Sequence, residues 1–115
     1  MEQFTKIFKA LADPNRVRIM KMLEQKQLCV CEITEILNLS TSTVSSHLSL
    51  LRRAGLIDYE KNGKWVDYKI NRESRDLILN QIIALMPAWL NDDEIVKIDL
   101  ENLKTADRNL ICATY

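Results

Sequence analysis

The fold is decided by residues 28–55, LCVCEITEILNLSTSTVSSHLSLLRRAG. Apolar side chains recur at helical spacing in each half of this stretch, at Ile33, Ile36 and Leu37 and then at Val44, Leu48 and Leu51. Only residues 38–40 separate the two patterns, which is too short for anything but a turn. The stretch therefore predicts a helix-turn-helix, two helices joined by a tight turn.

The second helix of this pair has an outer face suited to DNA. Short hydrogen-bonding side chains come first and cations follow, which is what a helix lying in a major groove needs. We expect DNA contacts from Ser40, Thr41, Thr43, Ser45, Ser46, His47, Arg52 and Arg53. The alternative is a solvated helix face. Two roles are open for His47: it could donate to a base edge or phosphate, or it could form a hydrogen bond with another helix. Arg52 and Arg53 are both expected to contact phosphates.

The size and composition fit one domain with one core, because the chain has 115 residues and 47% of them are hydrophobic. No apolar run approaches the roughly 20 residues of a membrane span. Residues 1–6 do not form a secretory signal. We therefore expect a cytoplasmic protein with no membrane contact. Its three cysteines are an odd number and are expected to remain thiols in a reducing compartment.

The formal net charge is zero, but the charge is unevenly distributed. Residues 1–72 hold 12 Lys and Arg against 8 Asp and Glu, whereas residues 73–115 hold 4 against 8. The basic excess lies with the helix-turn-helix, which gives modest support to a nucleic-acid partner.

Two helices are predicted ahead of this motif. An apolar stripe over residues 4–11 predicts the first. Asp13 is a good N-cap and Pro14 a good first-turn residue, so a second helix begins there. The polar residues 24–27 are then expected to form a loop.

A hairpin is predicted after the motif. Residues 56–61 and 64–70 read as strands, and Asn62-Gly63 between them is a strong signal for a two-residue turn. Lys61 and Lys64 lie at its tip. A cationic hairpin beside a DNA-reading helix is expected to act as a wing that touches phosphate or minor groove.

A fifth helix, capped by Asn71 or Ser74, is predicted by a broad apolar face made of Leu77, Ile78, Ile82, Leu85 and Met86. Pro87 ends or kinks it. Together with the stripe on residues 4–11, this face exceeds what a small core needs. We therefore expect these two helices to form a homodimer interface.

The domain is expected to span residues 1–90, with residues 91–115 forming an acidic C-terminal extension. Ile95, Ile98 and Leu103 allow one more amphipathic helix, which would add to the dimer interface. The last ten residues, including Cys112, are expected to be mobile.

This order of elements is that of a winged helix-turn-helix, mainly α with a two-stranded hairpin. Three motifs make the chain resemble the ArsR/SmtB family of metal-responsive repressors over about residues 4–90. They are LADPNRVRI at residues 11–19, LCVCEI at residues 28–33 and VSSHLSLLRRAGL at residues 44–56. The resemblance implies a homodimer that binds an inverted-repeat operator in double-stranded DNA and is released when an ion binds. No organic cofactor is expected.

The second motif resembles the metal or metalloid site of arsenic- and cadmium-sensing members, which implies Cys29 and Cys31 as ligands. Thiolates suit soft acceptors, so As(III) or Sb(III) is the expected effector, with Cd(II) as another candidate. Residues two apart share a face in extended backbone but not in a helix. A shared ion therefore favours a non-helical segment here. The alternative is a pair of buried structural thiols.

The sequence departs from the family pattern at two places. The position where arsenic sensors often carry a third cysteine is Thr34. Cys112 is then the remaining candidate for a three-thiolate site, from the same chain or from the partner; the alternative is an incidental tail cysteine. The only histidine is His47, which excludes a His-rich zinc site on the fifth helix.

Three other functions compete with an ion sensor. A redox- or persulfide-responsive repressor would use the same thiols. A Cys29–Cys31 disulfide would close a small strained ring, whereas pairing with Cys112 would not have that problem. A DNA-binding dimer without an effector is a further alternative. The sequence has no Cys-x-x-Cys, phosphate loop or catalytic constellation, so we predict no catalytic residues and no enzyme.

Overall fold

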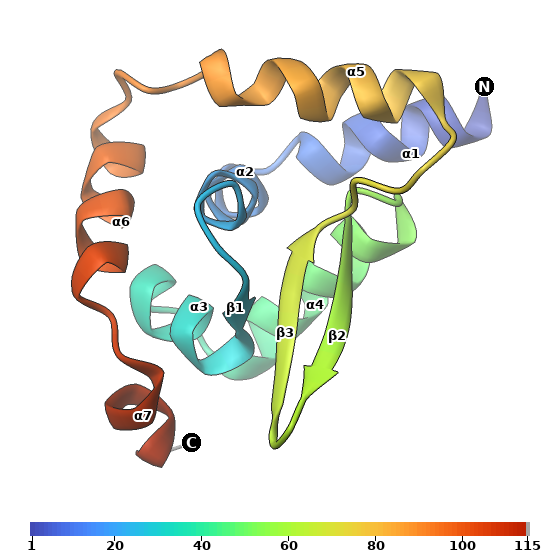
Figure 1. Cartoon of the computed structure of the whole chain (residues 1–115). Helices are drawn as coiled ribbons and strands as arrows, with labels where there is room; N and C mark the ends of the chain where they lie inside the picture. Colours follow the sequence, from blue (N-terminus) through green and yellow to red (C-terminus); the bar gives the residue numbers. More distant parts are fainter. Residues whose placement is uncertain (115) are drawn as a thin grey trace.

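The computed structural model describes residues 1–114; Tyr115, the end of the predicted extension, lies outside the described residues. In chain order the elements are α1 (Glu2–Leu11), α2 (Pro14–Leu23), β1 (Leu28–Cys29), α3 (Val30–Leu37), α4 (Thr41–Arg53), β2 (Ile57–Asn62), β3 (Trp65–Ile70), α5 (Leu77–Leu85), the 3-10 turn η1 (Met86–Ala88), α6 (Glu94–Thr105), α7 (Arg108–Ile111) and the 3-10 turn η2 (Cys112–Thr114). Figure 1 shows the β2–β3 hairpin projecting from the helices, with α6 and α7 leading down one side of the molecule. The predicted winged helix-turn-helix is confirmed.

The predicted helix-turn-helix is formed by α3 and α4. Asn38 ends α3 in the left-handed conformation with φ of 56°, which asparagine tolerates better than most residues. Ser40 then caps α4, because its Oγ accepts a hydrogen bond from the backbone N–H of Thr43. The apolar side chains of both helices enter the core, at Ile33, Leu37, Val44, Leu48 and Leu51. The outer face of α4 is left to solvent.

The sheet has three strands in the order β1-β3-β2, one more than the hairpin predicted from the sequence. The added strand, β1, has only two residues, which is too short to give an alternating pattern. It pairs antiparallel with β3 and sets Cys29 opposite Asp67. The start of the helix-turn-helix is thereby tied to the wing.

The hairpin turn lies one residue later than predicted. Asn62 pairs with Trp65 as the last rung of the ladder, so the loop is Gly63-Lys64 and not Asn62-Gly63. Gly63 has φ of +62°, whereas Lys64 does not have a positive φ. A positive φ at the first loop position alone is that of a type II′ turn, which favours glycine there.

The caps predicted for α5 were wrong. Asp76 caps this helix, because its carboxylate accepts a hydrogen bond from the N–H of Leu79. Asn71 instead donates its side-chain amide to the carbonyl of Gly55, and Ser74 accepts a bond from the Asp76 N–H. These side chains hold the approach to α5 rather than its first turn.

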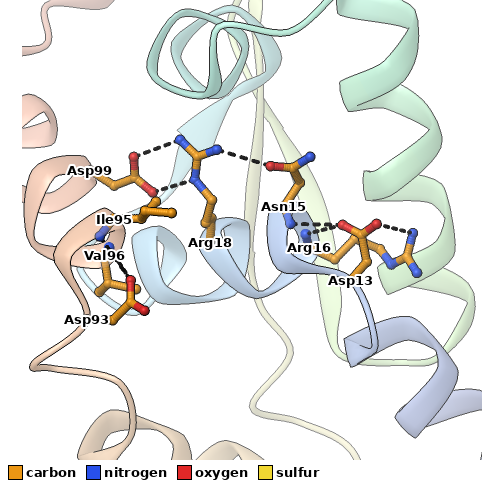
Figure 2. A network of polar contacts seen from close by, with 8 residues as sticks. All are labelled: Asp13, Asn15, Arg16, Arg18, Asp93, Ile95, Val96 and Asp99. Atoms are coloured by element: carbon orange, nitrogen blue, oxygen red, sulfur yellow. Dashed lines mark hydrogen bonds and ion pairs between the residues drawn. The ribbon is translucent and has the colours of Figure 1, made fainter.

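The predicted sixth helix exists as α6, and the two isoleucines expected to add to a dimer interface lie on its exposed face. Ile95 and Ile98 are more than half exposed, whereas Val96, Asp99 and Leu103 are buried. The buried face of α6 includes an ion pair with a distant element, drawn in Figure 2: the Arg18 guanidinium of α2 donates to both carboxylate oxygens of Asp99, at 2.8 and 3.0 Å. This pair holds the Asp99 side of α6 against α2, and Ile95 and Ile98 lie on the outer side.

Exposed apolar side chains gather on α1, α5 and the turn after it. They are Phe4, Phe8, Leu77, Ile78, Leu85 and Trp89, of which Leu77 is 76% exposed. Only part of the predicted α5 face is therefore buried, chiefly Ile82 and Met86. None of the helices described over residues 1–114 is long and apolar enough to span a membrane.

Candidate metal centre and nucleic-acid interface

The three cysteines lie together although Cys112 is more than 80 residues from the other two. The Cys29 sulfur is 3.1 Å from that of Cys31 and 3.4 Å from that of Cys112. All three sulfurs lie within 4.8 Å of one another, so each can offer a ligand atom to one ion. Cys112 can therefore reach the other two sulfurs within one chain, and its role as a ligand stays a prediction.

Local structure explains how Cys29 and Cys31 converge. Cys29 is the N-cap of α3, with the extended backbone angles φ −85° and ψ 166°, whereas Cys31 lies in the first turn of the helix. The predicted non-helical segment is thus correct for Cys29 and wrong for Cys31. A residue at the N-cap and one in the first turn bring their sulfurs together without a continuous extended segment.

The tail supplies the third sulfur through α7 and η2. The structure joins Cys31 and Cys112 by a disulfide, with their Cα atoms 5.6 Å apart, and leaves Cys29 as a free, buried thiol. That Cα separation is ordinary for a disulfide. The same arrangement therefore suits two chemistries, a bond between two of the sulfurs or a shared ion on all three once that bond is reduced.

A buried carboxylate stands beside the sulfurs. Glu32 accepts hydrogen bonds from the backbone N–H of Cys29, at 3.0 Å, and from its thiol, at 3.2 Å. Burial raises the pKa of the Cys29 thiol and the Glu32 carboxylate adds to the shift, whereas the Glu32 backbone N–H and the charge of Arg108 oppose it. The thiol form is thus favoured in the free protein, and a soft ion must displace this proton to bind.

Arg108 connects the tail to the wing. Its guanidinium donates to Asp67 of β3 at 2.6 Å and lies 4.8 Å from the ring centroid of Trp65. Asp67 is buried and also accepts a bond from the Asn62 side chain at 2.9 Å. A hydrogen-bonded path therefore runs from α7, which carries the tail toward Cys112, to the end of β2 beside the wing tip.

The predicted DNA-contacting side chains are accessible on α4 and the wing. Those that are exposed are Ser40, Thr41, Thr43, Ser45, Ser46, Arg52, Arg53, Lys61 and Lys64. Arg52 is held against the base of the wing, with its guanidinium carbon 4.2 Å from the ring centroid of Tyr59 and its Nε 3.8 Å from Asp58. Their contacts with DNA remain predictions.

His47 is only partly exposed and contacts another helix, the second of the two roles considered for it. The Arg16 guanidinium lies 3.2 Å from its Nδ1. Because arginine only donates, Nδ1 accepts and the proton of the neutral ring sits on Nε2. Nε2–H thus remains a donor for a base edge or phosphate.

The DNA contacts expected from the sequence leave out two serines of the same helix, Ser42, which is exposed, and Ser49, which is partly exposed. Buried Val44, Leu48 and Leu51 mark the inner side of α4. At about 100° per residue, positions 42, 46, 49 and 53 form the stripe opposite them. The intervals between these positions are four, three and four residues, and this helical spacing could have been read from the sequence.

Comparisons with known proteins point to one family of regulators. Residues 13–59 match the family model described as bacterial regulatory protein, arsR family. The chain is 45% identical over 94 residues to the cadmium resistance transcriptional regulatory protein CadC homolog of Staphylococcus aureus, covering 81% of this chain and 73% of that protein. It is 36% identical over 107 residues to the arsenical resistance operon repressor of Escherichia coli, covering 90% of this chain and 81% of that one.

The chain belongs to the ArsR/SmtB family. Members of this family are metal-responsive transcriptional regulators and not enzymes, so the family predicted from the three motifs and the prediction of no enzyme are both confirmed. A solved structure is also similar: reduced HlyU from Vibrio cholerae superposes with a TM-score of 0.62 at 30% identity, over 76% of this chain and 90% of that one. The family model spans α2 to β2, and so includes the ArsR/SmtB helix-turn-helix, Cys29 and Cys31.

Proposed function

We propose that this ArsR/SmtB protein is a homodimeric, cytoplasmic repressor that binds an inverted-repeat operator and is released by As(III) or Sb(III). Cys29, Cys31 and Cys112 are the proposed ligands. One observation carries the proposal: a tail cysteine lies against the two thiols at the start of the helix-turn-helix, within 4.8 Å. Three thiols and no histidine form a donor set for a soft acceptor.

The relatives support an ion of this class without choosing one. The Escherichia coli relative is an arsenical resistance repressor and the Staphylococcus aureus relative a cadmium resistance regulator. Three sulfurs from one chain favour As(III) or Sb(III), because a four-coordinate site such as that of Zn(II) would need a further ligand. Among residues 1–114, Glu32 is the nearest candidate for that ligand, and its carboxylate is hydrogen-bonded to Cys29.

The position of the site suggests how an ion would act on DNA binding. Cys29 belongs to β1 and caps α3, while Cys112 follows α7 with its Arg108–Asp67 contact. An ion held by these sulfurs would fix α7 against both the helix-turn-helix and the wing. Successive major grooves on one face of DNA are about 34 Å apart. We propose that ion binding changes the separation or orientation of the two α4 helices of the dimer, so that they no longer fit two such grooves.

The test is operator binding titrated separately with arsenite, antimonite, cadmium, zinc and an oxidant. Arsenite or antimonite is expected to release the reduced protein from DNA, with a coupling of about 1–3 kcal/mol or roughly 5- to 150-fold. Cys29→Ser and Cys31→Ser should each keep DNA binding and lose this release, because serine preserves the size but is not a soft ligand. Release by arsenite that survives Cys29→Ser would overturn the proposal.

A second candidate is a thiol redox- or persulfide-responsive repressor, and the Cys31–Cys112 disulfide favours it. Forming that bond takes two electrons and two protons from the thiols and gives them to an oxidant such as a peroxide. The variants separate the two functions. Under the redox alternative Cys29→Ser still responds to the oxidant, because both bonded cysteines remain, whereas Cys31→Ser and Cys112→Ser do not.

A further inference from the structure

We infer that a cationic groove between α1 and α4 binds the DNA backbone on the side of the reading helix away from the wing. The inference rests on the proposed role of α4 as the DNA-reading helix and adds a second phosphate-binding surface to it. The groove has a volume of about 400 Å³. Its lining is formed by Glu2, Thr5, Lys6, Lys9, Ala10, Arg16, Leu50 and Arg53.

The lining is predominantly cationic. Lys6, Lys9 and Arg53 are exposed, and none of them forms an ion pair with a residue in the described part of the chain. Arg16 is ordered, since its guanidinium donates to the carbonyls of Ala10 and Lys9. Arg16 also pairs with Asp13 at 3.9 Å, so three unpaired cations of the lining face one carboxylate, Glu2. Such a surface attracts an anion of extended shape.

The groove flanks the exposed stripe of α4. Arg52 turns toward the wing, where it stacks on Tyr59. Leu50 lines the groove, and His47, on the same side of α4, contacts Arg16 of α2. The wing and the groove therefore lie on opposite sides of the stripe that carries Ser42 and Ser46.

This placement matches the geometry of a duplex. A helix in the major groove, about 12 Å wide, has a phosphate backbone on each side. The wing lysines can meet one backbone, and Arg53, one of the two arginines expected on phosphate, lines the groove on the side of the other backbone. Lys6 and Lys9 are placed for that second backbone.

The cationic edge of α1 is also separate from its apolar surface. At about 100° per residue, Lys6 and Lys9 lie on the side of the helix opposite Phe4 and Phe8. Burial of the two phenylalanines between subunits would leave the lysines open. Dimer formation and phosphate binding by α1 are therefore compatible.

The experiment measures DNA affinity against salt concentration for the full chain and a duplex selected by it from a random library. In Lys6→Gln with Lys9→Gln, a dimer loses four phosphate contacts if each lysine makes one. The slope of log affinity against log salt should then fall by about 3.6. Affinity should fall about equally for specific and unrelated duplexes, because backbone contacts carry no sequence information.

Two further double variants serve as controls. Lys97→Gln with Lys104→Gln makes the same change of net charge on exposed positions of α6 and should leave the slope at the parent value. Lys61→Ala with Lys64→Ala removes the wing cations and should lower it. If the Lys6/Lys9 variant kept the salt slope of the parent while the wing variant had a lower slope, phosphate binding by the groove would be contradicted and the proposed function would stand. A parent that binds no duplex would overturn the proposed function and the groove together.

Discussion

Cys29 belongs to three parts of the molecule at once. It is the last residue of β1 and the N-cap of α3, and its sulfur contacts the sulfurs of both other cysteines. Its backbone N–H is held by Glu32, and β1 pairs it with Asp67 of the wing. Under the proposed function, a change of bonding at this sulfur acts directly on the helix-turn-helix and the wing.

Asp13 gives a prediction about stability at the scale of one residue. Its carboxylate caps α2 by accepting bonds from the N–H groups of Asn15 and Arg16, at 2.8 and 3.2 Å. Burial alone would raise the pKa of this carboxyl, but these N–H groups and the charge of Arg16 hold it below its ordinary value of 3.8. Asp13→Ala should cost about 1 kcal/mol of the free energy of unfolding at pH 7.

The pH dependence of this loss has a definite sign. A carboxyl whose pKa is lowered by folding stabilises the protein above its unfolded pKa, and the contribution disappears as pH falls through the folded pKa. The difference between parent and Asp13→Ala should therefore shrink as the pH is lowered below about 4. Urea unfolding at several pH values measures it, and Asp13→Asn is the matched control, because it keeps the capping oxygen without the charge. A difference that grows toward low pH would contradict this account of the cap.

Among the elements, α7 is the proposed connection between ion and wing. Arg108→Gln keeps the three cysteines and removes the charged contact with Asp67. We expect this variant to bind arsenite nearly as tightly as the parent but to be released from DNA less, by under about 5-fold. Arsenite titration of the free protein gives the first quantity and release from labelled operator gives the second.

Arg75→Gln is a suitable control for the Arg108 variant, because Arg75 is an exposed arginine outside the sulfur cluster. Full arsenite-driven release in Arg108→Gln would show that the coupling does not pass through Asp67. Loss of arsenite binding itself would mean that Arg108 positions the tail cysteine rather than the wing.

The elements that depend on local chemistry were predicted from the sequence. Asp13 is a cap because its side chain reaches the next turn of its own helix, and apolar spacing marked the inner side of α4. Features set by distant partners were not predictable in this way. Asp99 is buried on α6 against Arg18, which is 81 positions away, and β1 exists only through its pairing with β3.

The candidate site also has a part that local sequence predicts and a part that depends on distant contacts. Cys29 and Cys31 could be proposed from two residues of separation and a family motif. The place of Cys112 depends on the path of α6 and α7, which the sequence left open. No periodicity indicated the contact between Arg108 and Asp67, because its two residues lie 41 positions apart.

The whole molecule leaves apolar side chains on α1 and α5 in contact with solvent. Phe4 and Phe8 are nearly half exposed, and Leu77 and Leu85 more than half. We expect these faces to be buried in a symmetric dimer at micromolar concentration without DNA. Leu77→Asp with Leu85→Asp should give a monomer with unchanged circular dichroism. Sedimentation velocity measures this, and a monomeric parent would contradict the proposed assembly.

The central claim is that one ion is held by all three cysteines. X-ray absorption at the arsenic edge tests it most directly, on protein that has been reduced, freed of added thiols and loaded with one arsenite per chain. We predict three sulfur neighbours at arsenic in the parent and two in Cys112→Ser. A parent with fewer than three sulfurs at arsenic, or an unchanged count in Cys112→Ser, would contradict the claim.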